Sequence, residues 1–274
     1  MFVRSLLTLF LCAISVGTCQ AQGLFAYDGA NNDLYSVTST PDATFIGEDF
    51  DSGVVAEIEA VFGLIYANDT ATGTNLHVIS RTSGEVLNTI DLNLPAGGNV
   101  ITAMEHANGT MYGGFTTAGQ GGGSALTTID LTTGDVQLVG GFSGINSALG
   151  GLAWDGQTMY GISSGGANAS LYSFDLATGV ETFLTTINDS SGGTIGLTAL
   201  EFGSDGELYA LANAASPIAG HLLSIDIDTG IYTDLGSTGT TPTLNSLTSI
   251  PEPASGMLAL AAISSFCLRR RRCR

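Results

Sequence analysis

Apolar and polar residues alternate along short stretches of the chain, and one turn sequence recurs between pairs of these stretches. Residues 171–174 read LYSF and residues 180–184 read VETFL, with DLATG at residues 175–179 between them. The turn recurs at residues 130–134 (DLTTG) and 226–230 (DIDTG), with a weaker copy at 80–84 (SRTSG). Two alternating stretches around an Asp/Thr/Gly turn predict a β-hairpin, in which the aspartate side chain accepts an Asx-type hydrogen bond inside the turn.

A second phrase occurs between these hairpins: an apolar stretch, a glycine turn and a stretch that contains tyrosine. Residues 101–105, for example, precede NGTMY at residues 108–112. The tyrosines of the four copies lie 46, 48 and 49 residues apart, at Tyr66, Tyr112, Tyr160 and Tyr209. The two phrases together make four short strands in about 45–50 residues, which is the size of a propeller blade.

The two ends of this repeating region complement each other. Residues 24–27, 34–37 and 43–46 have the pattern of the second, third and fourth strands of a blade that lacks its first strand. Residues 244–250 have the pattern of a first strand without followers. Joining them completes a fifth blade and removes an open sheet edge. We therefore predict an all-β fold, a five-bladed β-propeller closed by its N- and C-terminal strands. A β-helix or a β-sandwich is the alternative, and a β-helix is disfavoured because its coils repeat at roughly half this spacing.

The composition restricts what this region binds. The chain has no lysine, and Arg81 is the one arginine in residues 22–250. These residues contain all but one of the 25 acidic residues, so their formal charge is −23. Such a surface repels phosphate backbones, which excludes nucleic acid as a partner. The four cysteines are Cys12, Cys19, Cys267 and Cys273. All lie outside residues 22–250, so packing without disulfides has to stabilise this region.

The two ends of the chain have the patterns of targeting segments. Residues 1–4 carry one positive charge, an apolar run follows at 5–16, and Cys19-Gln20-Ala21 is suited to cleavage before Gln22. A lipoprotein signal ending at Cys19 is the alternative, disfavoured by Thr18 before the cysteine. At the other end, the apolar run 254–268 would span ~22 Å as a helix, short of the ~30 Å hydrocarbon core of a membrane. The arginines that follow it would stay in the cytoplasm. They are Arg269, Arg270, Arg271 and Arg272.

The triplet Pro251-Glu252-Pro253, the apolar run and the arginine cluster, in this order at the chain end, resemble the sorting signal of the PEP-CTERM family of bacterial proteins. The resemblance covers about 25 residues, and a chance triplet before an ordinary tail anchor is the alternative. It implies export, transient inner-membrane association and processing by an exosortase-type membrane protease-transpeptidase. It further implies delivery to the cell surface or to an extracellular polysaccharide matrix. The predicted organisation is a signal peptide (1–21), a propeller domain (22–250) and a sorting signal (251–274).

Three glutamates, Glu59, Glu105 and Glu201, end the expected innermost strands of three blades, and Ala153 takes this place in a fourth. One interpretation is a ring of carboxylates for a cation such as Ca²⁺, or an acid/base set like those of some five-bladed glycosidases. The other is that they are solvated strand ends, repeated because the blades repeat. We favour the second, since catalytic carboxylates with perturbed pKa values rarely recur around a fold.

The remaining candidates carry weaker patterns. Asp226 with Asp228, and Asp49 with Asp51, have the alternate spacing of calcium loops, but neither pair continues to the distal glutamate of an EF-hand. Residues 161–165 (GISSG) match a serine-hydrolase string without the helix that a nucleophile elbow needs. The histidines have no zinc-site spacing. The four tyrosines, with Phe25 at the fifth position, are expected in the core between blades, and stacking on sugars is the alternative.

These observations favour a secreted propeller that binds or scaffolds at the cell surface or in the matrix, without catalysis and without a cofactor. Extracellular polysaccharide is the expected partner besides the sorting enzyme. Two alternatives remain: a hydrolase or lyase acting on matrix polysaccharide, and a module for calcium-dependent adhesion.

Overall fold

The computed structural model describes residues 23–28, 31–38, 40–48, 55–69, 73–95, 100–116, 123–142, 144–145, 147–163, 168–240 and 244–249. The predicted signal peptide and the whole predicted sorting signal, from Pro251 through the arginine cluster, lie outside these residues. Within them, no helix is long and apolar enough to cross a membrane.

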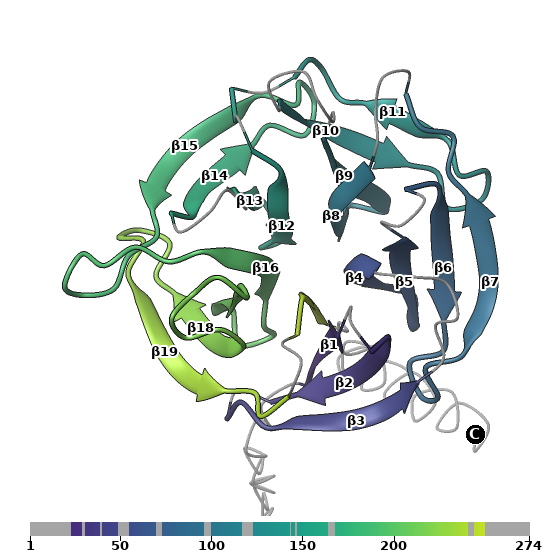
Figure 1. Cartoon of the computed structure of the whole chain (residues 1–274). Helices are drawn as coiled ribbons and strands as arrows, with labels where there is room; N and C mark the ends of the chain where they lie inside the picture. The colour runs from purple at the N-terminus through teal and green to yellow at the C-terminus, as the bar shows by residue number, and fades with distance from the viewer. Residues whose placement is uncertain are drawn as a thin grey trace, which may run out of the picture.

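The described residues form five four-stranded sheets arranged in a ring (Figure 1). We call the region that the five innermost strands surround, where some of their side chains meet, the central channel. The closing sheet contains, in order, β20 (Ser246–Ser249), β1 (Leu24–Asp28), β2 (Asp33–Val37) and β3 (Ala43–Glu48). The next contains β4 (Val55–Val61), β5 (Leu64–Asp69), β6 (Asn75–Ile79) and β7 (Val86–Asp91). The third contains β8 (Val100–Ala107), β9 (Thr110–Thr116), β10 (Ser124–Ile129) and β11 (Val136–Leu138). The fourth contains β12 (Leu149–Trp154), β13 (Met159–Ser163), β14 (Ser170–Phe174) and β15 (Glu181–Thr186). The last contains β16 (Leu197–Phe202), β17 (Leu208–Ala212), β18 (His221–Ile225) and β19 (Tyr232–Ser237).

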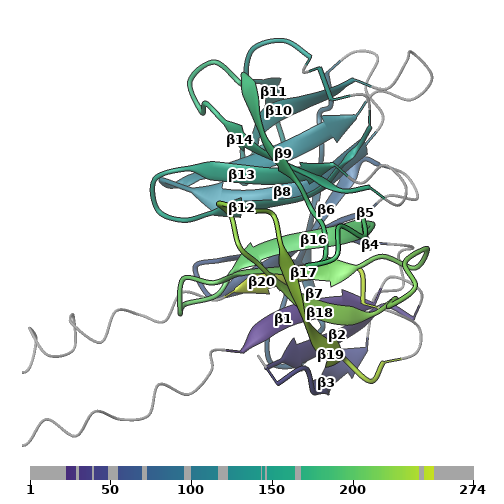
Figure 2. The same ribbon diagram turned by 90° about the vertical axis from the view of Figure 1, so that its left-hand side faces the viewer.

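The ring closes by pairing strands from opposite ends of the described chain. β20 is antiparallel to β1, with Leu24 opposite Ser249 and Tyr27 opposite Ser246. The Asn245 N–H extends this ladder by donating to the Tyr27 carbonyl at 2.8 Å. In the side view the two strands lie next to each other (Figure 2). The predicted five-bladed propeller, closed by both terminal strands, is therefore confirmed.

The recurring aspartate turns make the predicted local hydrogen bonds. In each, the aspartate side chain accepts backbone N–H groups two and three residues on, as when Asp175 Oδ1 accepts from Ala177 at 2.8 Å and Thr178 at 2.9 Å. The glycine that ends this turn, Gly179, has φ +69°, and a Cβ there would lie 1.6 Å from the Val139 carbonyl oxygen of the neighbouring blade. Glycine is thus needed twice, for the left-handed backbone and for the close approach between blades.

The hydrophobic core lies between neighbouring sheets. One cluster joins Tyr112 and Leu126 of the third sheet to Leu152 and Met159 of the fourth. Tyr209 is buried, and Tyr66 and Tyr160 pack in part against other clusters. Phe25 packs against the cluster that contains Ile58 and Ile65. These contacts confirm the expectation that the aromatic set belongs to the core between blades.

A buried carboxylate cluster as candidate functional site

The three predicted glutamates occupy the same position in their blades. Each lies on the innermost strand, directly opposite the tyrosine of the second strand. The pairs are Glu59 with Tyr66, Glu105 with Tyr112, and Glu201 with Tyr209. Because the blades are repeats arranged in a ring, equal register places the three carboxyl groups at one level of the channel.

The other two blades contribute different residues at this level. Ala153 lies opposite Tyr160 in the fourth blade, as the sequence spacing predicted. In the closing blade, Thr248 lies opposite Phe25. Ala153, on the strand between β8 and β16, has a methyl group where the other three blades have a carboxyl group, and Thr248 has a hydroxyl group there.

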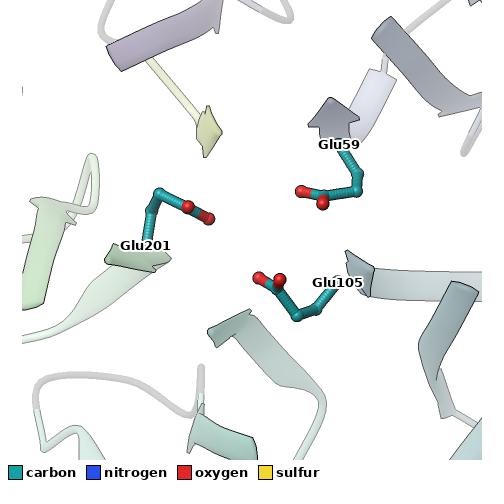
Figure 3. A group of neighbouring side chains, drawn as sticks. All are labelled: Glu59, Glu105 and Glu201. Carbon is teal, nitrogen blue, oxygen red and sulfur yellow. The ribbon is translucent and has the colours of Figure 1, made fainter. Parts of the chain in front are cut away.

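The carboxylates meet in the channel. Glu59, Glu105 and Glu201 each offer an oxygen, and these three oxygens lie within 4.8 Å of one another. Figure 3 shows the three side chains pointing toward one another from three separate strands. Their exposed fractions are 4%, 6% and 6%. The expectation that they are solvated strand ends was therefore wrong: the inner strands approach closely enough that the neighbouring blades cover them.

Hydroxyl groups of the closing strand hold two of the carboxylates. Thr248 donates from Oγ1 to Glu59 Oε2 at 3.0 Å, and Ser249 donates from Oγ to Glu201 Oε1 at 2.5 Å. The backbone N–H of His106 donates to Glu59 Oε1 at 3.1 Å. Glu105 differs, since its Oε2 is buried and has no hydrogen-bond partner.

A fourth glutamate, Glu57, lies on the same strand as Glu59 and is 2% exposed. The Ser246 hydroxyl donates to Glu57 Oε1, while Glu57 Oε2 has no hydrogen-bond partner. Sequence reasoning missed Glu57 and the serine and threonine residues of β20. The signal available was the alternation of Ser246 and Thr248 on a strand expected to line the channel.

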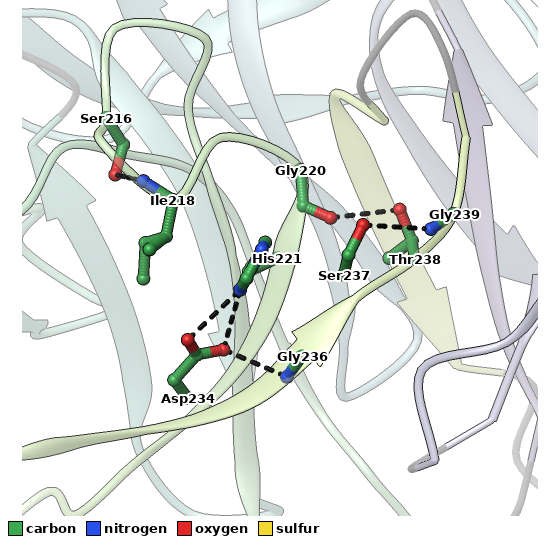
Figure 4. Close-up of polar contacts among 9 residues, drawn as sticks. All are labelled: Ser216, Ile218, Gly220, His221, Asp234, Gly236, Ser237, Thr238 and Gly239. Atoms are coloured by element: carbon green, nitrogen blue, oxygen red, sulfur yellow. Dashed lines mark hydrogen bonds and ion pairs between the residues drawn. The ribbon is translucent and has the colours of Figure 1, made fainter.

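Burial dominates the electrostatics of this cluster. It raises the pKa of Glu59 to about 8, against the opposing effect of the hydrogen bonds from Thr248 and His106. Burial raises the pKa of Glu105 and Glu201 well above the ordinary value, and repulsion from Glu59 adds to it. Burial also raises the pKa of Glu57. An ion pair joins His221 and Asp234 at 2.9 Å, away from the cluster (Figure 4). Among the described residues, no basic side chain forms an ion pair with Glu57, Glu59, Glu105 or Glu201.

That ion pair has a local structural role. His221 Nδ1 on β18 lies between the two oxygens of Asp234 on β19, at 2.9 and 3.0 Å. Asp234 Oδ1 also accepts from the Gly236 N–H at 2.9 Å, and Thr238 donates to the Gly220 carbonyl at 2.9 Å. Figure 4 shows these contacts joining neighbouring segments of one blade. They tie the outer strand to its neighbour, away from the carboxylate cluster.

The other predicted candidates stay apart from the cluster. Asp226 and Asp228 are exposed, and Asp226 Oδ1 accepts N–H bonds from Asp228 and Thr229, both at 3.0 Å, as an Asx turn. Asp49 and Asp51 lie outside the described residues. Ser163 lies in β13, where its hydroxyl accepts from the Ser170 N–H at 3.0 Å. His77 is buried and hydrogen bonded to Thr89 at 3.0 Å.

A groove of about 460 Å³ lies at the turns of the second and third blades. Phe62, Met111, Leu131 and Gln137 are among the residues that line it, together with His106. Phe62 is 87% exposed, and its ring centroid lies 5.5 Å from that of His106 in an edge-to-face arrangement. An aromatic pair with adjacent polar groups is a surface that suits a polar ligand with an apolar face.

Comparison with known proteins supports the fold. No family model matches the chain, and no curated protein matches it. Among solved structures, the chain is similar to one described as the crystal structure of a nidogen/laminin complex, with a TM-score of 0.52 and 14% identity over 83% of this chain and 85% of that one. A luciferin-regenerating enzyme also matches, with a TM-score of 0.43 and 15% identity over 85% of this chain and 78% of that one. At 14% identity, the similarity to the nidogen/laminin structure shows a propeller-like fold alone. Nothing about this chain is inferred from the similarity to the luciferin-regenerating enzyme.

Proposed function

We propose that this chain is an exported binding or scaffold propeller, sorted by an exosortase-type system to the cell surface or the extracellular matrix, and that it is not an enzyme. Its partners in this proposal are the sorting enzyme and extracellular polysaccharide. The proposal joins the binding module that the propeller fold suggests to the targeting patterns in the sequence.

The observation that carries the proposal is the pairing of Leu24 with Ser249. This register places the first and last described strands side by side, so the predicted signal peptide and sorting signal join the propeller at the same blade. Leu24 lies two residues after the predicted start at Gln22, and Ser249 two residues before Pro251. Cleavage at either predicted boundary would therefore remove no strand and leave the ring closed.

The burial of the carboxylates supports a non-catalytic role. A glycoside hydrolase needs its acid and its nucleophile or base on either side of the sugar bond that it cleaves. Glu59, Glu105 and Glu201 are at most 6% exposed and have oxygens within 4.8 Å of one another. A polysaccharide chain has no room between them. The groove beside Phe62 is open instead, and it is the surface that we assign to polysaccharide binding.

The acidic exterior indicates which polysaccharide fits. A formal charge of −23 on residues 22–250 repels an anionic polymer unless cations screen or bridge the two. A neutral polysaccharide stacking on Phe62 and His106 is not repelled. We therefore expect binding to neutral polymers that depends little on salt.

Mass spectrometry of the protein recovered from outside the cell tests the sorting proposal. The expected species begins at Gln22 and lacks the apolar run after Pro253, and a Pro251→Ala, Pro253→Ala variant keeps its tail and stays in the membrane fraction. An intact chain found in the cytoplasm, from Met1 to Arg274, contradicts export. Turnover of a polysaccharide by the purified protein, lost in Glu105→Gln, contradicts the non-catalytic assignment.

A further inference from the structure

The geometry points to a divalent-cation site in the central channel, in which Glu59, Glu105 and Glu201 bind one Ca²⁺ ion. This inference goes beyond the proposed function and does not depend on export or sorting. The site would join three of the five blades through a single ion, since the ligands come from β4, β8 and β16.

The first step of the argument is charge. Taking a carboxylate out of water is costly unless a cation or hydrogen bonds compensate it. Three carboxyl groups meet here, a fourth lies nearby at Glu57, and the described part of the chain has no basic side chain paired with any of them. A divalent cation supplies the missing positive charge at the point where the three side chains converge.

The second step is the unpartnered oxygen. Glu105 is 6% exposed, and its Oε2 has no hydrogen-bond partner. Buried polar atoms nearly always have such a partner. Figure 3 shows this carboxyl group directed at those of Glu59 and Glu201 rather than at solvent. An oxygen in this position has the free lone pairs that a metal ligand requires.

The third step is distance. Ca²⁺ binds oxygen ligands at about 2.3–2.6 Å, so ligands on opposite sides of one ion are up to about 5 Å apart. Mg²⁺ binds at about 2.0–2.1 Å, which limits that separation to about 4 Å. The three glutamate oxygens lie within 4.8 Å of one another, inside the separation of about 5 Å that one Ca²⁺ ion allows. Hard carboxylate oxygens without a histidine or cysteine ligand also favour Ca²⁺ over Zn²⁺.

The fourth step is preorganisation. Hydrogen bonds from Thr248, Ser249 and the His106 N–H orient Glu59 and Glu201, as hydrogen-bonded partners of metal ligands do in other proteins. Each bond occupies one lone pair of an oxygen that has two. Glu59 and Glu201 are thus fixed in place, by the closing strand and, for Glu59, by the His106 N–H as well, while ligand capacity remains.

The experiment uses the full chain, purified in detergent, freed of metal by chelator and kept in about 0.15 M NaCl to screen surface charge. Isothermal titration with CaCl₂ should show one site per chain. Ca²⁺ at a hundredfold excess over Kd should raise the Tm by roughly 5–10 °C. Glu105→Gln should abolish both effects.

Glu207→Gln is the matched control, since Glu207 is an exposed glutamate in the turn before β17. It should bind Ca²⁺ like the wild type. If Glu105→Gln fails to fold, Glu201→Gln serves in its place with the same expected result. Absence of a stoichiometric calcium site in the wild type overturns the proposal and leaves a protonated cluster. An undiminished site in both glutamine variants, or preferential binding of Mg²⁺ or Zn²⁺, overturns it as well.

Discussion

Replacing Thr248 by valine tests whether the closing strand stabilises the ring through its polar side chains. The Thr248 hydroxyl accepts the Ala60 N–H at 2.8 Å and donates to Glu59 Oε2 at 3.0 Å. Thr248 and Ala60 are 0% and 6% exposed, so water does not replace the lost bonds. Valine keeps the shape of threonine and leaves both partners without their hydrogen bond to residue 248.

The magnitude follows from the two buried groups. Each buried donor or acceptor left unsatisfied costs about 1–3 kcal/mol, so losing the bonds of two such groups in Thr248→Val should lower the free energy of unfolding by roughly 2–6 kcal/mol. For a domain of this size, that corresponds to a Tm lower by roughly 4–24 °C. Urea unfolding followed through Trp154, the sole tryptophan, measures the change at pH 7 in chelator.

Two controls separate the hydroxyl from its surroundings. Thr248→Ser keeps the hydroxyl and loses one methyl group, so it should cost about 1 kcal/mol. Thr38→Val removes an exposed hydroxyl that bonds to Thr40 at 2.7 Å, and it should change stability by less than about 0.5 kcal/mol. A Thr248→Val protein as stable as the wild type, or no more destabilised than Thr248→Ser, would refute the reasoning.

Two further predictions concern the cluster and the turns. In chelator the free energy of unfolding should fall as pH rises from 7 to 8. Burial raises the pKa of Glu59 from 4.5 to about 8 and also raises the pKa values of Glu57, Glu105 and Glu201. The folded state therefore binds more protons than the unfolded state in this range and loses stability as those protons leave. Burial lowers the pKa of His77 and His106, which opposes this trend only below about pH 6.5, so the measurement is made between pH 7 and 8. A Tm that increases from pH 7 to pH 8 would contradict the raised pKa values of the glutamates. Gly179→Ala should cost more than about 4 kcal/mol in urea unfolding, since its Cβ would meet the Val139 carbonyl at 1.6 Å. Gly109→Ala, at φ +82° with nothing within 4 Å of its Cβ, should cost only about 1–2 kcal/mol, and equal losses in the two variants would show that the contact between blades contributes nothing.

The fold was predictable because its signals are local and repeated. The turns at Asp130, Asp175 and Asp226 have side-chain hydrogen bonds that depend on residues two and three positions away, so the sequence alone specifies them. The closing strand, expected within residues 244–250, is β20, Ser246–Ser249. It was predictable because a ring with an open edge leaves backbone groups unpaired, whatever the side chains are.

The burial of the carboxylates was not predictable in the same way. The register of Glu59, Glu105 and Glu201 follows from the repeat, but their exposure depends on how close the five inner strands approach one another, which no single blade specifies. The unlike residues at the equivalent position carried the missing signal. If the position of the glutamates were exposed to solvent in every blade, any polar residue would be tolerated there. A small apolar residue, Ala153, in one blade and a hydrogen-bond donor, Thr248, in another are instead expected where side chains from the five blades are packed together.

The closing strand links ring closure to assembly of the carboxylate cluster. The hydroxyls of Ser246 and Thr248 accept the N–H groups of Ile58 and Ala60 on β4, at 2.7 and 2.8 Å, and donate to Glu57 and Glu59 on the same strand. Ser249 reaches the other neighbour through Glu201. The side-chain hydrogen bonds to Glu57, Glu59 and Glu201 therefore form only when β20 is in place. Since its negative charges repel one another until protons or a cation neutralise them, neutralisation and closure of the ring should stabilise each other.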